Sequence, residues 1–158
     1  MSGYVHVYTG NGKGKTTAAM GLALRAAGAG WNVFIAQFGK PHHSSEVQAL
    51  RRYDDRIAVR HYAGGMVEQG LAECKEALAS GDYGLVVLDE ANVGPMLEMF
   101  PADELLALLD ARDDAVELVI TGRYAPPIVM ERADLVTEMR EVKHYYQQGV
   151  LARVGIER

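Results

Sequence analysis

Short apolar runs alternate along the chain with longer segments in which apolar residues recur every three or four positions. The short runs have the length and composition of buried strands, and they cover residues 4–8, 32–38, 57–62, 85–88, 116–121 and 135–138. The segments between them have helical periodicity, at residues 16–27, 44–53, 66–80, 102–111 and 126–132. This alternation predicts an α/β fold with a mostly parallel sheet and helices on both faces. No linker, repeat or low-complexity segment divides residues 1–158, so a single domain is expected.

Composition and charge narrow the classes of function. The 158 residues are 49% hydrophobic, which is enough for one domain with its own core. A net charge of −5 argues against a nucleic-acid partner. No apolar run approaches the roughly 18 residues of a membrane span, and the first residues lead directly into a strand, so neither a membrane partner nor a signal peptide is expected. The single cysteine, Cys74, is interpreted as a packed helical residue, and the absence of a disulfide pair predicts a cytoplasmic location.

The most specific motif is a glycine-rich turn between the first predicted strand and the first predicted helix. It consists of Thr9, Gly10, Asn11, Gly12, Lys13, Gly14, Lys15, Thr16 and Thr17. Glycines let backbone N–H groups turn towards a phosphate, and the start of a helix adds its positive dipole end. In this phosphate loop Lys15 is predicted to contact the phosphates and the Thr16 hydroxyl to bind Mg²⁺. The loop is unusual because Thr9 stands where a glycine is expected and Lys13 adds a second lysine.

A pair of acids, Asp89 and Glu90, directly follows the apolar run at 85–88. Asp89 is predicted to reach Mg²⁺, directly or through water, beside Thr16. Glu90 is predicted either to join the metal shell or to act as a base for water. The pair would also be compatible with a simple strand cap, but its position after a phosphate loop in an α/β pattern favours the functional interpretation.

Further cations lie at or beyond predicted strand ends. Arg123 follows the strand at 116–121, and we predict that it contacts phosphate because its guanidinium suits bidentate binding. Lys40 is explained equally well as a loop lysine, and Lys143 with His144 is better explained as a solvated surface.

The other histidines do not predict a metal site. His42 and His43 are adjacent on a loop, so their side chains point apart, and no cysteine or acid stands at ligand spacing. His6 lies among apolar strand residues and is expected to bond internally.

Several segments, in order over nearly the whole chain, carry a resemblance to a known family: 9–19, 37–40, 87–92, 119–123, 133–140 with Lys143-His144, and 149–157. Together they resemble the ATP:corrinoid adenosyltransferases of the phosphate-loop type. The resemblance implies a P-loop NTPase-like sheet of the RecA type.

The resemblance also implies a reaction. A reduced Co(I) corrinoid, the second substrate, would attack C5′ of ATP and release the whole triphosphate. The resemblance implies catalytic roles for Lys13, Lys15, Glu90 and Arg123, with Mg²⁺ accompanying ATP near Thr16, Asp89 and Glu90. It implies further that ATP lies with its terminal phosphate deepest in the loop, that the protein is a homodimer, and that a separate flavoprotein reductase supplies the reduced corrinoid.

The sequence also departs from the family pattern near the predicted corrinoid site, and two alternative functions are left open. The region 61–69 lacks the Phe-x-Trp pair with which some members displace the lower ligand of the corrinoid, and Tyr62 and Met66 are the nearest apolar candidates. The alternatives are an ATPase or kinase with Glu90 as its general base, and a non-catalytic ATP-binding relative.

Overall fold

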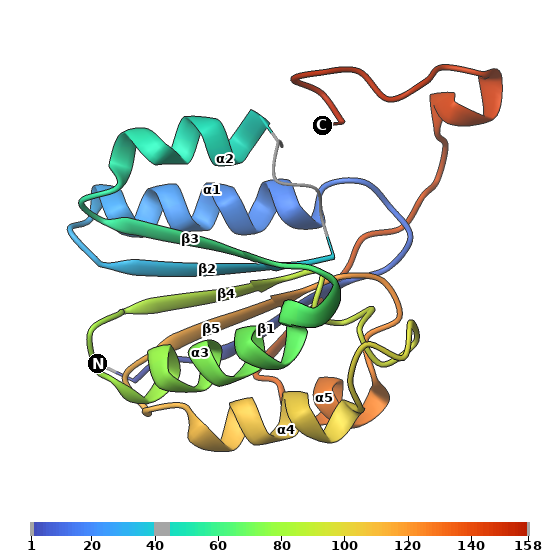
Figure 1. Cartoon of the computed structure of the whole chain (residues 1–158). Coiled ribbons are helices and arrows are strands. Elements are labelled where there is room, and N and C mark those ends of the chain that lie inside the picture. The colour runs from blue at the N-terminus through green and yellow to red at the C-terminus, as the bar shows by residue number, and fades with distance from the viewer. Residues whose placement is uncertain (1, 40–44, 158) are drawn as a thin grey trace.

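A six-stranded sheet forms the centre of the protein (Figure 1). The computed structural model describes residues 2–39 and 45–157. The strands are β1 (Val5–Thr9), β2 (Val33–Phe38), β3 (Ile57–Tyr62), β4 (Leu85–Asp89), β5 (Glu117–Thr121) and β6 (Leu135–Glu138). They lie in the order β3-β2-β4-β5-β1-β6, and every pairing is parallel. The predicted parallel α/β sheet is confirmed.

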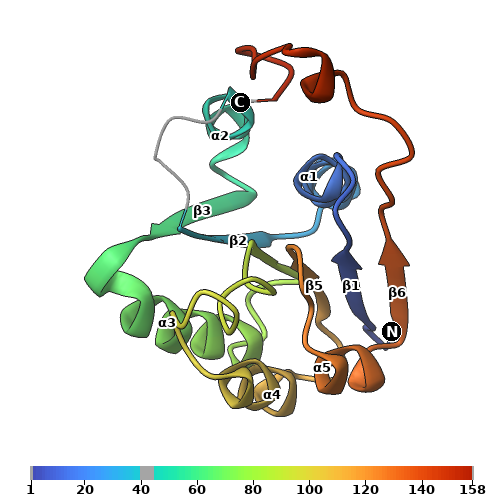
Figure 2. The same ribbon diagram turned by 90° about the vertical axis from the view of Figure 1, so that its right-hand side faces the viewer.

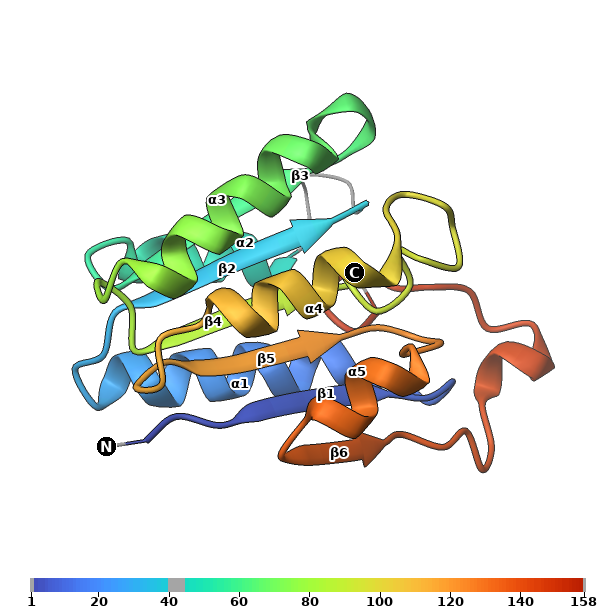
Figure 3. The ribbon, with the colours of Figure 1, turned by 90° about the horizontal axis from the view of Figure 1, so that it is seen from below.

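Helices cover both faces of this sheet, as Figure 2 shows. One face carries α1 (Lys15–Gly28) and α2 (Ser45–Leu50), and α2 runs into the 3₁₀ turn η1 (Arg51–Tyr53). The other face carries α3 (Val67–Ala79), α4 (Ala102–Ala111) and α5 (Pro127–Arg132), seen from below in Figure 3. The turn η2 (Gly64–Met66) leads into α3. No helix among residues 2–39 and 45–157 has both the length and the apolar character needed to cross a bilayer.

Two-sided burial explains why the central strands are apolar at every position. Val33 and Ile35 of β2 belong to the core under α1 and α2, whereas Phe34, Ala36 and Phe38 belong to the core under α3 to α5. Successive side chains of a strand point to opposite faces, so each face of β2 needs its own apolar residues.

The strand order brings four distant segments to one edge of the sheet. Because all strands are parallel, their carboxyl ends lie together, where open α/β sheets bind ligands. Gln37 of β2 stands opposite Asp89 of β4, and Tyr8 of β1 stands opposite Thr121 of β5. The loop after β1 therefore lies beside the ends of β2, β4 and β5.

A C-terminal arm, residues 139–157, leaves β6 and was not predicted as a structural unit. It contains the turn η3 (Tyr145–Gln148) and runs past α1 towards α2 on the same side of the sheet (Figure 2).

Candidate active site

The phosphate loop is held in place by the start of the C-terminal arm. Gly12 N–H donates to the carbonyl of Met139 at 2.6 Å, and Met139 N–H donates to the carbonyl of Thr9 at 2.8 Å. A Cβ on Gly10 would lie 2.4 Å from the Met139 oxygen, and Gly10 has a φ of 92°. Close approach of the arm therefore requires glycine here, in addition to any requirement set by a phosphate.

Lys15 occupies the middle of this loop. Its Nζ donates to the carbonyls of Gly10 and Gly12, both at 2.7 Å, and the side chain is buried. Gly14 precedes α1 and the first turn of α1 contains no acid, so the positive end of the helix dipole is not neutralised by the helix itself. An ammonium and a helix N-terminus thus meet at one point, which is an arrangement suited to a polyanion.

Asp89 is the centre of a buried polar cluster at the ends of three strands and the start of α1. Its Oδ1 accepts hydrogen bonds from Thr16 Oγ1 at 2.9 Å and from Thr121 Oγ1 at 2.7 Å. Its Oδ2 accepts from Gln37 Nε2 at 3.0 Å. Asp89, Gln37 and Thr121 are fully buried. These three donors fix the orientation of the carboxylate.

Glu90 and Arg123 lie just beyond the ends of the strands that carry Asp89 and Thr121. Glu90 has a φ of 61°, a left-handed conformation that non-glycine residues rarely adopt, and its N–H donates to Thr121 Oγ1 at 3.1 Å. Arg123 follows Gly122 at the end of β5 and is exposed. Both side chains line the same cleft.

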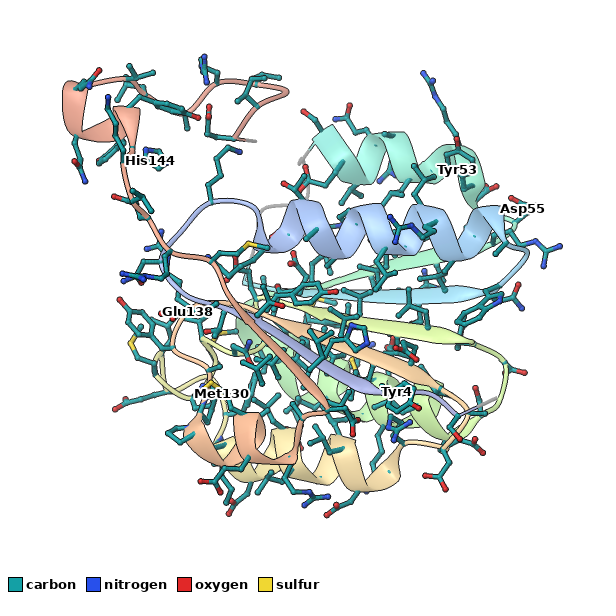
Figure 4. The ribbon with its side chains drawn as sticks, turned by 180° about the vertical axis from the view of Figure 1, so that it is seen from behind. Tyr4, Tyr53, Asp55, Met130, Glu138 and His144 are labelled. Atoms are coloured by element: carbon teal, nitrogen blue, oxygen red, sulfur yellow. The ribbon has the colours of Figure 1, made fainter. Side chains whose placement is uncertain are left out.

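That cleft has a volume of about 1150 Å³ and extends from the phosphate loop along α1. The polar end is lined by residues 11–17 with Glu90 and Arg123, and the walls further along include Met20, Leu24, Leu50 and Tyr53. Residues 155–157 of the C-terminal arm also line it. Figure 4 shows two other lining residues, His144 on the arm and Tyr53 after α2, near opposite ends of α1.

Lys13 connects the loop to the arm instead of joining the Asp89 cluster. Its Nζ donates to the carbonyl of Ile156 at 2.7 Å. The end of the arm is folded back on itself by Glu157, which accepts hydrogen bonds from Arg153 and from the Tyr145 hydroxyl. These bonds, from Arg153 first and then Tyr145, lower the pKa of Glu157 to about 2.

The complete chain, residues 1–158, matches the family model described as ATP:corrinoid adenosyltransferase BtuR/CobO/CobP. The chain belongs to the corrinoid adenosyltransferase family.

Three named relatives are similar over nearly the same length. The corrinoid adenosyltransferase of Pseudomonas aeruginosa is 36% identical over 169 residues, covering 98% of this chain and 83% of the relative. The corrinoid adenosyltransferase CobA of Salmonella typhimurium is 35% identical over 167 residues, with 98% and 85% covered. The corrinoid adenosyltransferase of Escherichia coli K12 is 34% identical over 167 residues, again with 98% and 85% covered.

In this corrinoid adenosyltransferase, most of the residues predicted from the sequence come together. Gly10 to Thr17 form one loop and helix start, and Thr16 contacts Asp89 directly. Thr9 differs, because its buried hydroxyl accepts a hydrogen bond from Ala125 N–H at 3.3 Å and so anchors the turn after β5. Lys40, His42 and His43 lie outside the described residues.

Two predictions about single side chains outside the site are confirmed. His6 bonds internally, with its Nε2 2.6 Å from Glu117 Oε1. Cys74 is fully buried in α3.

Of the two candidates for the missing aromatic pair, Tyr62 is buried and its hydroxyl donates to Glu73, whereas Met66 is half exposed. This contact and burial raise the pKa of the Tyr62 hydroxyl, with burial the larger cause. Met66 is therefore the candidate whose side chain reaches solvent.

The sequence reasoning missed two members of the Asp89 cluster, Gln37 and Thr121. Both were part of motifs, but neither was assigned a role. Each is a polar residue at the end of an apolar strand, which is a feature visible in the sequence. To assign it a role, however, one must know which strands are neighbours in the sheet.

Proposed function

We propose that this protein transfers the 5′-deoxyadenosyl group of ATP to the cobalt of a reduced Co(I) corrinoid and releases tripolyphosphate. The observation that carries the proposal is the cleft itself. In a member of this family, a phosphate loop with a buried lysine opens into a space of about 1150 Å³, larger than a nucleotide-sized pocket requires.

The proposed reaction is a displacement at carbon. The Co(I) centre of the substrate donates an electron pair to C5′, the C5′–O bond breaks, and its electron pair leaves with the triphosphate. Cobalt is thereby oxidised to the Co(III) alkyl product. Negative charge grows on the departing α-phosphate oxygen, so the site needs cations and N–H donors along the phosphates rather than a base that activates water.

The chain supplies these groups at the polar end of the cleft. Lys15 and the start of α1 would bind phosphate at the bottom of the loop, and Arg123 would approach from the end of β5. We propose that the terminal phosphate lies deepest, which leaves C5′ towards the open cleft and the corrinoid.

A magnesium ion fits the donors of this site. Thr16, Asp89 and Glu90 offer hydroxyl and carboxylate oxygens, the ligands that Mg²⁺ prefers, and they adjoin the phosphate loop. When bound with ATP, Mg²⁺ would neutralise phosphate charge and so stabilise the leaving triphosphate. Because Asp89 already accepts from Thr16, Thr121 and Gln37, we assign it to water-mediated rather than direct contact with the ion.

Three further parts of the proposal concern location and partners. A separate flavoprotein reductase and a homodimer are proposed on the family resemblance. A cytoplasmic location is proposed because Cys74 is the single cysteine of the sequence, which leaves no disulfide pair.

The test is an incubation of the protein with MgATP and a chemically reduced corrinoid. We expect the absorbance change of an alkylated corrinoid and, by ³¹P NMR, tripolyphosphate in equal amount. Lys15→Ala is expected to abolish both products. Lys75→Ala, at an exposed position of α3 far along the chain from the loop, is the matched control that leaves them unchanged. ADP and orthophosphate as the only products would instead favour an ATPase with Glu90 as base. ATP binding without any product would favour a non-catalytic relative.

A further inference from the structure

Gln37 has an unusual environment for a neutral side chain. It is fully buried at the end of β2, directly opposite Asp89 in the neighbouring strand. Its Nε2 donates to Asp89 Oδ2 at 3.0 Å, whereas its Oε1 is buried and accepts no hydrogen bond from the described residues. A buried amide oxygen without a donor is costly, so such a group calls for an explanation.

The orientation of this amide is set by charge. If the amide were turned over, Oε1 would face the Asp89 carboxylate, and two acceptors would be in contact with no proton between them. Asp89 therefore keeps Nε2 towards itself and leaves Oε1 as an unused acceptor in the same cluster.

The hydroxyl and amide donors of this cluster point to Asp89, and one acceptor, Gln37 Oε1, is left over among the described residues. Asp89 accepts from Thr16, Thr121 and Gln37, and all three bonds hold the carboxylate in one position. The remaining unused group is an acceptor, so a ligand that completes the cluster must bring a donor. Water bound to Mg²⁺ is such a donor, because the cation polarises its O–H bonds.

We propose that Gln37 is a positioning residue for the magnesium ion that accompanies ATP. Its Nε2 fixes Asp89, and its Oε1 is the acceptor for a donor that arrives with the hydrated ion. The inference rests on the proposed function only in taking MgATP as the ligand, and it concerns binding rather than adenosyl transfer.

The experiment compares the affinity of Gln37→Met for MgATP with its affinity for ATP in excess EDTA, measured by calorimetry without corrinoid. Methionine has a similar length but neither amide group. Loss of such an outer contact to a metal site costs typically about tenfold to a hundredfold in affinity, and we expect a loss in that range for MgATP. Metal-free ATP, held by Lys15 and the loop N–H groups, should bind almost as it does to the unmodified protein. As a second readout, the electron paramagnetic resonance spectrum of bound MnATP should change.

Ile35→Val is the matched control, because Ile35 is buried on the same face of β2 two residues earlier and belongs to the apolar core. It should leave the ratio of the two affinities unchanged. Gln37→Asn, which keeps the amide on a shorter side chain, should give an intermediate loss and serves if the methionine variant does not fold.

Equal weakening of MgATP and metal-free ATP would overturn the proposal and leave Gln37 a purely structural residue. Unchanged affinity for both would overturn it as well. Because no corrinoid is present, either result is distinguishable from a failure of adenosyl transfer.

Discussion

At the scale of single residues, Thr121 shows how one hydroxyl can organise two acids. Its Oγ1 donates to Asp89 Oδ1 at 2.7 Å and accepts from the Glu90 N–H at 3.1 Å. The side chain is fully buried, so water cannot replace these bonds without entering the core. Thr121 therefore fixes the orientation of Asp89 and the left-handed backbone of Glu90 together.

Thr121→Val removes this hydroxyl with little change of shape. We expect it to lower the free energy of unfolding by about 1–3 kcal/mol, because the partly buried Glu90 N–H loses its acceptor and the buried Asp89 carboxylate loses a donor. The rate of adenosyl transfer should fall more than ATP affinity, since Lys15 still holds the phosphates. Thr121→Ser keeps the hydroxyl and is the control. Equal activity of the valine and serine variants would show that the bond to Asp89 has no part in the reaction.

At the scale of elements, the C-terminal arm is distinct from the strands and helices because most of it is exposed. Its end is closed by Glu157, whose pKa is lowered to about 2 by Arg153 and Tyr145. A lowered carboxyl pKa means that this closure is complete above the ordinary value of 4.5 and is lost as the pH falls towards 2. At neutral pH the closed end is thus available to accept the hydrogen bond from Lys13.

Lys13 has two possible partners, the Ile156 carbonyl and the phosphates of ATP. Lys13→Ala is expected to speed amide hydrogen exchange in residues 150–157, because the bond from the phosphate loop to the arm is lost. Adding ATP to the unmodified protein should also speed exchange in this segment. A phosphate attracts the Lys13 ammonium more strongly than a neutral carbonyl does, so ATP would draw Lys13 away from Ile156. Lys75→Ala provides the surface-lysine control. Exchange that is the same with and without Lys13 would mean that other contacts hold the arm.

At the scale of the whole molecule, the sheet separates two cores, one under α1 and α2 and one under α3 to α5. The central strands contribute to both, so loss of either helical layer exposes apolar strand residues. We therefore expect the two layers to unfold together rather than one by one.

Cys74 can measure this cooperativity. It is fully buried in α3, and burial raises the pKa of its thiol to about 12, so the folded protein has almost no reactive thiolate at pH 8. Labelling by a thiol reagent should require opening, and it should be rapid in denaturant. Although α3 lies on the face opposite α1, MgATP at 100 times its dissociation constant should slow labelling by about 100-fold if opening is global. A labelling rate that is the same with and without MgATP would reveal a separate local opening of α3.

Much of this architecture follows from local patterns. All six strands and five helices lie close to their predicted positions, because buried strands and amphipathic helices have different apolar periods that are visible in a single chain. The phosphate loop, Asp89 and Glu90 are likewise evident from short motifs, since the chemistry of phosphate and magnesium binding needs those residue types in close succession.

What the sequence could not determine is which strands are neighbours. That order depends on long-range packing and places β2 beside β4, so Gln37 faces Asp89 across 52 positions of the chain. It also brings Thr121 to the same carboxylate and turns Thr9 towards Ala125. The contact between Lys13 and Ile156, 143 positions apart, has no local signal either. Periodicity and motifs therefore determined the elements and the type of chemistry, whereas only the tertiary structure decided which polar side chains complete the site.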